Sequence, residues 1–130
     1  MNPFQQHGAF SWSELITSDV EGARAFYSQL FGWTLKEGPI GGTPYTVIEV
    51  DGQEIGGMAP PPPNQANMPP TWGIYITVED VDAIAAKAKS LGGEVLLPPM
   101  SVESVGKFSL IKDPQGATFC AIQYNQRNEE

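Results

Sequence analysis

Basic residues and histidine are both scarce in this chain. Seven Lys and Arg residues stand against fifteen Asp and Glu residues, which gives a formal net charge of −8. The basic residues form no run, so we predict neither nucleic acid nor an anionic membrane as a partner. The one histidine, His7, precedes the first predicted strand. No motif positions it for catalysis, and this excludes most mechanisms that depend on histidine.

Cysteine and long apolar runs are scarce as well. The lone cysteine, Cys120, cannot form a disulfide within the chain and fits a reducing cytoplasm. No apolar run approaches the roughly 18 residues that a membrane-spanning helix needs. The first residues, MNPFQQHGAF, lack the basic start and apolar core of a signal peptide. We therefore expect a cytoplasmic protein, and its 130 residues fit a single domain, 1–130.

Two amphipathic helices are predicted, within residues 18–33 and 79–94. In the first, Ser18 can act as the N-cap with Glu21 three residues later, and Gly32 supplies a left-handed stop. Both segments place apolar residues at steps of three, four and three, with a constant offset of 61 between them. These positions are Val20, Ala23, Tyr27 and Leu30 in the first segment, and Val81, Ile84, Ala88 and Leu91 in the second. The shared spacing indicates an internal repeat.

Strand-like runs surround each helix in the same order. FSWSELIT (10–17) and TWGIYITV (71–78) precede the helices, and Trp12 matches Trp72 at an offset of 60. After each helix come a short run, TLKE or EVLLPP, and two β-rich runs joined by a strong turn signal, Asp-Gly or DPQG. The chain thus reads as two βαβββ modules, at 8–58 and 71–125.

Between the modules runs APPPPNQANMPP (59–70), a linker whose prolines lack the N–H donors that a helix or central strand needs. A stiff connector is the simplest interpretation, and a loop over a ligand site or a partner-binding motif are the alternatives. One module alone would leave a face of its sheet bare. We therefore predict an α+β fold in which two paired βαβββ modules form a cup-shaped mixed β-sheet with the helices outside.

Three stretches, WSELITSDVEGARAFYSQLFGW, DGQEIGGM and GKFSLIKDPQGATFCAIQ, resemble the vicinal oxygen chelate superfamily. This superfamily includes glyoxalase I, extradiol dioxygenases and bleomycin-resistance proteins. The resemblance covers residues 8–125 and implies a glyoxalase-like domain, often in a homodimer. For metal-dependent members it also implies four ligands, typically His, Glu or Gln, on the first and fourth strands of both modules.

In this chain the matching positions carry Ser13, Gly73, Gly56 or Gly57, and Cys120. Glycine has no donor atom, serine is a poor neutral ligand, and one thiol cannot hold an ion in a site built for four ligands. We therefore predict no metal and no other cofactor. This puts the metal-dependent activities of the superfamily in doubt for this chain.

Strand alternation predicts which side chains face the cup. The expected cup residues of the first strands are Ser11, Ser13 and Leu15 in one module and Gly73, Tyr75 and Thr77 in the other. Glu14 then falls on the apolar side, where it would need a partner such as Arg24, a backbone donor or another subunit. The predicted ligand-binding residues are Ser13, Met58, Gly73, Tyr75 and Cys120, although Met58, Tyr75 and Cys120 are also suited to the core.

The function that these observations favour is binding of a small organic molecule, aromatic ones included, in a metal-free cup. One alternative is a lyase or other enzyme of the superfamily with an atypical site, for which Glu14, Glu54, Tyr75 and Cys120 are candidates. A non-catalytic interaction subunit is the other. The sequence leaves open whether the modules pair within one chain or across a homodimer.

Overall fold

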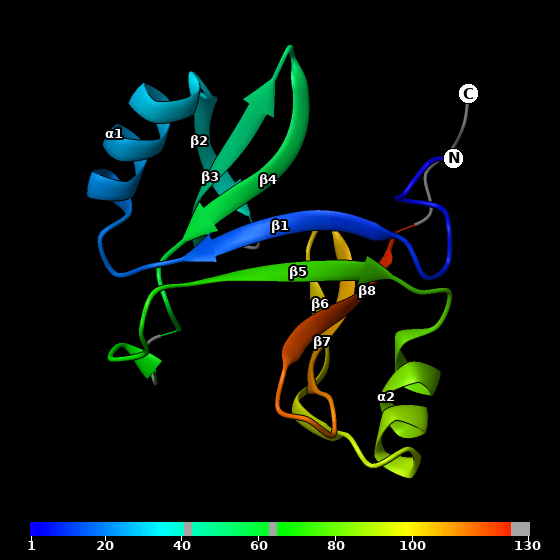
Figure 1. Ribbon diagram of the computed structural model, residues 1–130. Helices are drawn as coiled ribbons and strands as arrows, with labels where there is room; N and C mark the ends of the chain where they lie inside the picture. The colour runs from blue at the N-terminus through cyan, green and yellow to red at the C-terminus, as the bar shows by residue number, and fades with distance from the viewer. Residues whose placement is uncertain (41–42, 63–64, 126–130) are drawn as a thin grey trace. The chain divides into compact units, whose positions relative to one another are not determined.

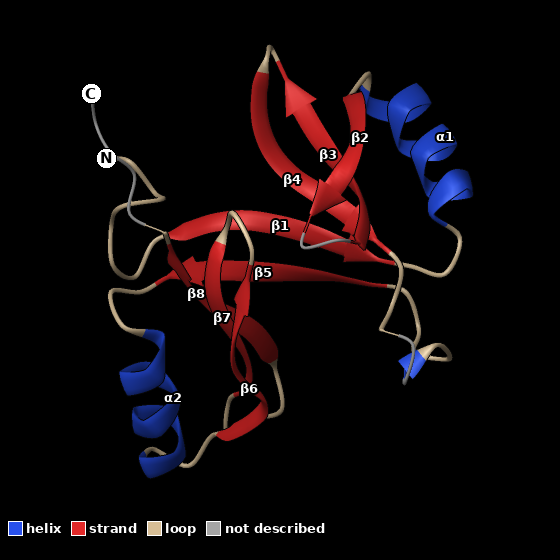
Figure 2. Ribbon diagram, turned by 180° about the vertical axis from the view of Figure 1, so that it is seen from behind, coloured by secondary structure: helices blue, strands red, loops and turns tan. Residues whose placement is uncertain are grey.

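The computed structural model describes residues 1–40, 43–62 and 65–125. In this part the elements in chain order are β1 (Phe10–Ile16), α1 (Val20–Phe31), β2 (Thr34–Ile40), β3 (Thr43–Val50), β4 (Gln53–Ala59), β5 (Thr71–Thr77), α2 (Val81–Ser90), β6 (Glu94–Val102), β7 (Gly106–Lys112) and β8 (Thr118–Tyr124) (Figure 1). The order βαβββ occurs twice, which confirms the predicted α+β class (Figure 2). Neither of the two helices is long and apolar enough to cross a membrane.

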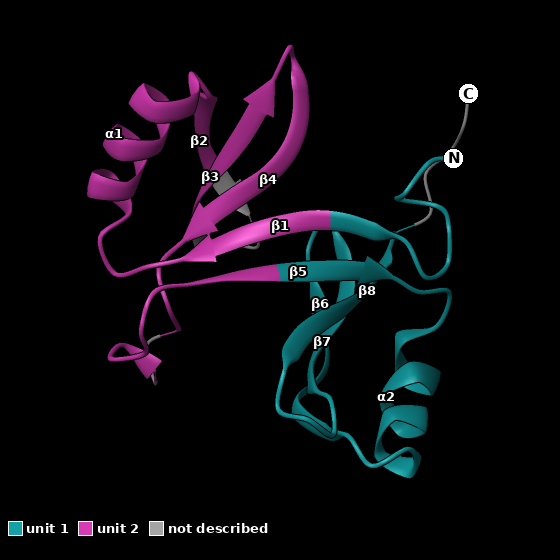
Figure 3. Cartoon of the chain, viewed as in Figure 1, with its two compact units in different colours: residues 1–11, 74–130 teal, residues 12–73 magenta. Residues whose placement is uncertain are grey.

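The chain divides into two compact units, shown in Figure 3. Unit 2 comprises residues 12–73, with the strand order β2-β3-β4-β1. β1 pairs with β4 in parallel, whereas the other neighbours are antiparallel. One face packs on α1, and the residues of this core are Leu15, Ile48 and Met58, against Val20, Ala23, Tyr27, Trp33 and Leu35.

Unit 1 comprises residues 1–11 and 74–130, with the strand order β5-β8-β7-β6. Its core is formed by Val78, Val81, Ile111 and Ala121, with Ile84 and Ala88 of α2 packed against it. The first residues of the chain are bound to β5. The Gly8 N–H donates to the Thr77 carbonyl oxygen at 2.7 Å, and the Thr77 N–H donates to that of Ala9 at 2.8 Å. Residues 1–11 are therefore part of this unit by backbone pairing.

The start of α1 differs from the sequence prediction. Asp19, not Ser18, is the N-cap, and its carboxylate accepts a hydrogen bond from the Gly22 N–H at 2.9 Å. Gly22 permits this approach because it has no Cβ. A Cβ at this position would overlap the Asp19 carboxylate. The predicted stop is confirmed, since Gly32 has a φ of 74° in the left-handed region.

Candidate functional site

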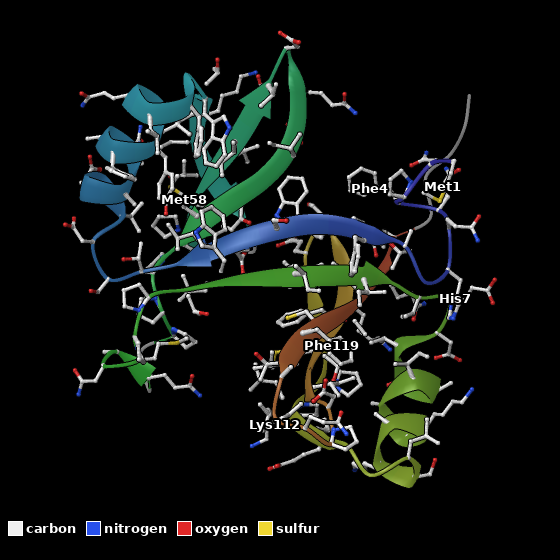
Figure 4. All side chains as sticks on the ribbon, viewed as in Figure 1. Met1, Phe4, His7, Met58, Lys112 and Phe119 are labelled. Atoms are coloured by element: carbon white, nitrogen blue, oxygen red, sulfur yellow. The ribbon has the colours of Figure 1, made fainter. Side chains whose placement is uncertain are left out.

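Each unit has one strand face covered by its helix, and we call the opposite face its helix-free face. In unit 1, Tyr75 of β5 lies in register with Cys120 of β8. The neighbours of Cys120 along the strand, Phe119 and Ala121, contribute to the core beneath α2 (Figure 4). Alternation therefore places Tyr75 and Cys120 side by side on the helix-free face, and both are partly exposed.

Phe108 is a further member of this face that sequence reasoning missed. It pairs with Ile122 of β8 and with Met100 of β6. Its ring centroid lies 6.3 Å from that of Tyr75, at an interplanar angle of 54°. The helix-free face of unit 1 thus combines two aromatic rings with the thiol of Cys120 and the half-exposed thioether of Met100. Alternation in KFSLIK places Phe108 and Ser109 on opposite faces of β7, but nothing in this run indicates which face lies against a helix.

In unit 2 the predicted faces of β1 are reversed. Leu15, expected to face away from α1, pairs with Met58 and is buried in the core beside that helix. Ser13 shares its face by alternation and pairs with Gly56, whereas Glu14 pairs with Gly57 on the helix-free face. Alternation correctly places Ser13 and Leu15 on one face, but it does not determine which face of β1 meets α1.

The reversal brings Trp12, Glu14 and Tyr45 together in a chain of hydrogen bonds. The Trp12 indole N–H donates to the Tyr45 hydroxyl oxygen at 2.9 Å, and the Tyr45 hydroxyl donates to Glu14 Oε2 at 2.8 Å. All three side chains are partly exposed. Glu14 therefore has a hydrogen-bonding partner on this face, the Tyr45 hydroxyl, which was not among the expected partners Arg24, a backbone donor and another subunit.

The other predicted site residues lie in different surroundings. Met58 is fully buried in the core between α1 and the strands of unit 2 (Figure 4). Gly73 ends unit 2, and a Cβ there would lie 4.0 Å from the Glu14 carbonyl oxygen, an ordinary contact distance. His7, labelled in Figure 4, accepts a hydrogen bond at Nδ1 from the Glu79 N–H at 3.1 Å. Two of the predicted residues, Tyr75 and Cys120, lie in direct register with each other.

The described residues of each unit line a cavity. One, of about 530 Å³, lies in unit 2 beside the start of α1, and Glu21, Glu37, Tyr45 and Met58 are among its lining residues. The other, of about 340 Å³, surrounds the β6–β7 turn of unit 1 and includes Lys107 and Tyr124. The unit 2 cavity is large enough for a small organic molecule.

Donor atoms for a metal ion do not gather in the part of the chain that the structure describes. There, no three His, Cys, Asp or Glu side chains lie close enough to hold one. On the helix-free face of unit 2, Glu14 of β1 pairs with Gly57 of β4. On the helix-free face of unit 1, Tyr75 of β5 pairs with Cys120 of β8. This set does not fit a divalent ion, which takes at least three side-chain ligands in a catalytic site.

Known proteins resemble this chain in sequence and in fold. "Putative glyoxylase CFP32" of Mycobacterium tuberculosis is 37% identical over 124 residues, which cover 93% of this chain and 48% of that protein. The "Anthracycline biosynthesis protein DnrV" of Streptomyces peucetius is 33% identical over 127 residues, covering 86% of this chain and 46% of that protein. The chain therefore spans about half the length of these curated relatives.

Among solved structures, methylmalonyl-CoA epimerase of Streptomyces coelicolor in complex with 2-nitronate-propionyl-CoA matches with a TM-score of 0.69 and 16% identity. That match covers 93% of this chain and all of the epimerase chain. An extradiol ring-cleaving dioxygenase from B. fuscum matches with a TM-score of 0.65 and 17% identity, over 99% of this chain and 36% of the dioxygenase. These likenesses show the fold.

A family model agrees with both comparisons and covers residues 9–121, most of the chain. Together with the relatives above 30% identity, it confirms the resemblance that the sequence stretches had indicated. The chain belongs to the glyoxalase/bleomycin resistance protein/dioxygenase superfamily.

Proposed function

We propose that this protein binds a small organic molecule at its helix-free faces without the help of a metal ion. The observation that carries this proposal is the chemistry of the unit 1 face. Two aromatic rings, Tyr75 and Phe108, lie there beside Cys120 and Met100. Of these four residues, Cys120 alone stands at a position where the family resemblance implies a metal ligand. Aromatic rings and sulfur atoms offer a polarizable surface that suits a planar, largely apolar ligand.

The relatives support organic ligands in general. One is named for anthracycline biosynthesis, and one structural neighbour is described in complex with a propionyl-CoA derivative. Because the chain spans about half the length of its curated relatives, their activities do not transfer directly. What supports the proposal is therefore the surface chemistry of this chain, together with its membership of the family.

A thermal-shift screen of small aromatic compounds tests the proposal, since a ligand that binds only the folded state raises the melting temperature. We expect at least one compound to raise it without being turned over. We also expect Phe108→Ala to abolish that rise while the variant remains folded by circular dichroism. Phe26→Ala is the matched control, because Phe26 is an exposed aromatic side chain on α1 of unit 2 and lies outside the face that we propose. A rise that survives Phe108→Ala would contradict the proposed face.

Metal analysis provides an independent test. Protein purified without a histidine tag should contain far less than one ion of zinc, nickel, iron or manganese per chain. Near-stoichiometric metal would overturn the metal-free binding that we propose, and it would favour the alternative of an enzyme with an atypical site.

We further propose that the protein is cytoplasmic and forms a homodimer, and that its two βαβββ segments arose as an internal repeat. The lone cysteine supports the first proposal, and the constant helix offset of 61 supports the last. The family resemblance supports the dimer, which sedimentation equilibrium would test directly. A molar mass near 14.0 kDa would contradict it.

A further inference from the structure

We propose that a second copy of this chain packs against an aromatic surface at α1 of unit 2. This inference rests on the homodimer proposed above, and it names the surface that forms the dimer. Five aromatic residues and one leucine make up this surface, which we call the α1 surface. They are Phe26, Tyr27, Leu30, Phe31 and Trp33, together with Trp72 at the start of β5, which belongs to the same unit (Figure 3).

Tyr27 joins the aromatic rings into one continuous cluster. Its ring centroid lies between 5.0 and 6.2 Å from the centroids of the other four rings. The Trp72 indole N–H also donates to the Tyr27 hydroxyl oxygen at 3.2 Å. Rings at these separations contact one another directly, so they leave no room between them for a small ligand. The cluster therefore offers an ordered aromatic surface, of the kind that forms the centre of protein interfaces.

The α1 surface is largely exposed in the structure. None of the twelve residues of α1 is buried, whereas α2 has two buried residues. Phe26, Leu30 and Phe31 expose 58%, 56% and 60% of their area. Trp72 exposes 43%. Large apolar side chains that are grouped and exposed in this way mark interaction sites on soluble proteins.

The other helix shows that the fold does not require this apolar surface. At the helix offset of 61, Lys87 of α2 stands where α1 has Phe26, and both residues are exposed. The exposed residues of α2 include three charged ones, whereas those of α1 after Glu21 carry no charge. These exposed residues of α1 are Gly22, Ala25, Phe26, Gln29, Leu30 and Phe31. The outer side of α1 thus differs from that of a helix that faces water.

Charge favours a second copy of the chain as the occupant. The formal net charge of −8 makes two copies repel each other in most orientations. Contact through the uncharged α1 surface avoids placing like charges together. A basic partner would find no carboxylate among the exposed residues of α1 after Glu21. Arg24, the one charged residue in that stretch, is already paired with Glu37 and Glu21.

The area of the α1 surface agrees with what a dimer needs. A large side chain offers roughly 200 Å² for burial, so the four that are about half exposed offer roughly 400 Å². A stable interface buries about 800 Å² on each partner, and about 65% of that area is apolar in homodimers. The α1 surface thus supplies most of the apolar share. In a two-fold dimer this surface of one copy meets the same surface of the other.

Sedimentation equilibrium of the full chain tests the proposal with a matched pair of substitutions. The parent should have twice the 14.0 kDa of one chain. Leu30→Lys should raise the dimer dissociation constant about 30-fold or more, because a two-fold contact brings the new charges of both copies together. Leu91→Lys is the control, since Leu91 ends α2 at the same offset of 61 and is 68% exposed. It adds the same charge outside the α1 surface and should leave the dissociation constant unchanged.

Phe26→Lys is a second variant, which gives α1 the residue that α2 carries at the same offset. It should weaken the dimer as Leu30→Lys does, and circular dichroism verifies that each variant is folded. The ligand-induced rise in melting temperature should persist in these variants and in Phe26→Ala, because the ligand face that we propose belongs to unit 1.

Two results would contradict the proposal in different ways. A dimer that keeps the parent affinity in both lysine variants of α1, or that Leu91→Lys weakens equally, would overturn the α1 surface and leave the homodimer standing. A parent mass of 14.0 kDa at all concentrations would overturn the α1 surface and the homodimer together. It would leave another protein as the occupant of this surface.

Discussion

The ring of Tyr45 lies against Gly57, and it fills the space that a side chain at position 57 would require. The two residues come from neighbouring strands, β3 and β4. Glycine at position 57 is therefore a condition for the hydrogen bond from Tyr45 to Glu14, not only a small residue in a strand.

Gly57→Ala should displace the Tyr45 side chain and lower the free energy of unfolding by about 1–3 kcal/mol, the usual cost of overpacking. In a Tyr45→Ala background the same substitution should cost much less, because the obstructing ring is gone. Urea denaturation of the two single variants and the double variant measures this coupling. Additive effects would show that the two side chains do not compete for the same space.

Asp19→Ala should lower the free energy of unfolding by about 1 kcal/mol, because the Gly22 N–H loses its capping partner. Ser18→Ala is the matched control, and we expect it to be nearly neutral. Thermal denaturation of both variants distinguishes the two candidate caps. A larger loss from Ser18→Ala would restore the cap that the sequence pattern had suggested.

Met58→Ala should destabilise unit 2 strongly, by about 2–5 kcal/mol, because the side chain is fully buried against α1. Denaturant unfolding measures the loss. If Met58 is a core residue alone, the affinity for a ligand found in the aromatic screen should stay within about threefold of the parent value, well under the tenfold that 1.4 kcal/mol represents. Lost affinity with stability retained would instead identify a ligand contact.

Tyr124 should make stability depend on pH in the alkaline range. Burial raises the pKa of its phenol, and the hydrogen bond with Ser11 lowers it by less. Since the folded-state pKa lies above the unfolded value, the folded state binds the proton more tightly. The contribution of the Tyr124 phenol to the free energy of unfolding is complete below about pH 10, the ordinary tyrosine pKa. This contribution is lost as the pH rises through the folded-state pKa of Tyr124.

Tyr124→Phe should therefore give a shallower loss of stability between about pH 9 and about pH 12. At neutral pH it should cost about 1 kcal/mol, because the hydroxyl lies 2.7 Å from Ser11 Oγ. Urea unfolding across this pH range measures both effects. An identical alkaline decline in the parent and the variant would assign the pH dependence to other groups.

The helices, the strands and their order could be predicted because local periodicity and turn residues determine them. The site could not, because it depends on which face of β1 meets α1. The match of Trp12 with Trp72 suggested an offset of 60, whereas the helices repeat at 61. Strand pairing agrees with an offset of 61. Leu15 and Ile76 are separated by this offset, and each pairs with a residue of its unit's core, Leu15 with Met58 and Ile76 with Ala121.

A shift of one residue exchanges the two faces of a strand, so this small difference decided the environment of Glu14. Phe108 and Tyr45 were missed for another reason. Their importance comes from neighbours distant in sequence, Tyr75 for Phe108 and both Trp12 and Gly57 for Tyr45. No local pattern around either residue contains that information.

The pairing of residues 8 and 9 with Thr77 sets an order for folding on the ribosome. Unit 2 is continuous in sequence, so it can fold as soon as residues 12–73 have left the exit tunnel. Residues 1–11 emerge before unit 2 and must wait for Thr77, and Ser11 must wait for Tyr124, which emerges later still. A nascent chain paused after residue 73 has emerged and before Thr77 has emerged would thus display a folded unit 2 while residues 1–11 are still open to proteases and chaperones.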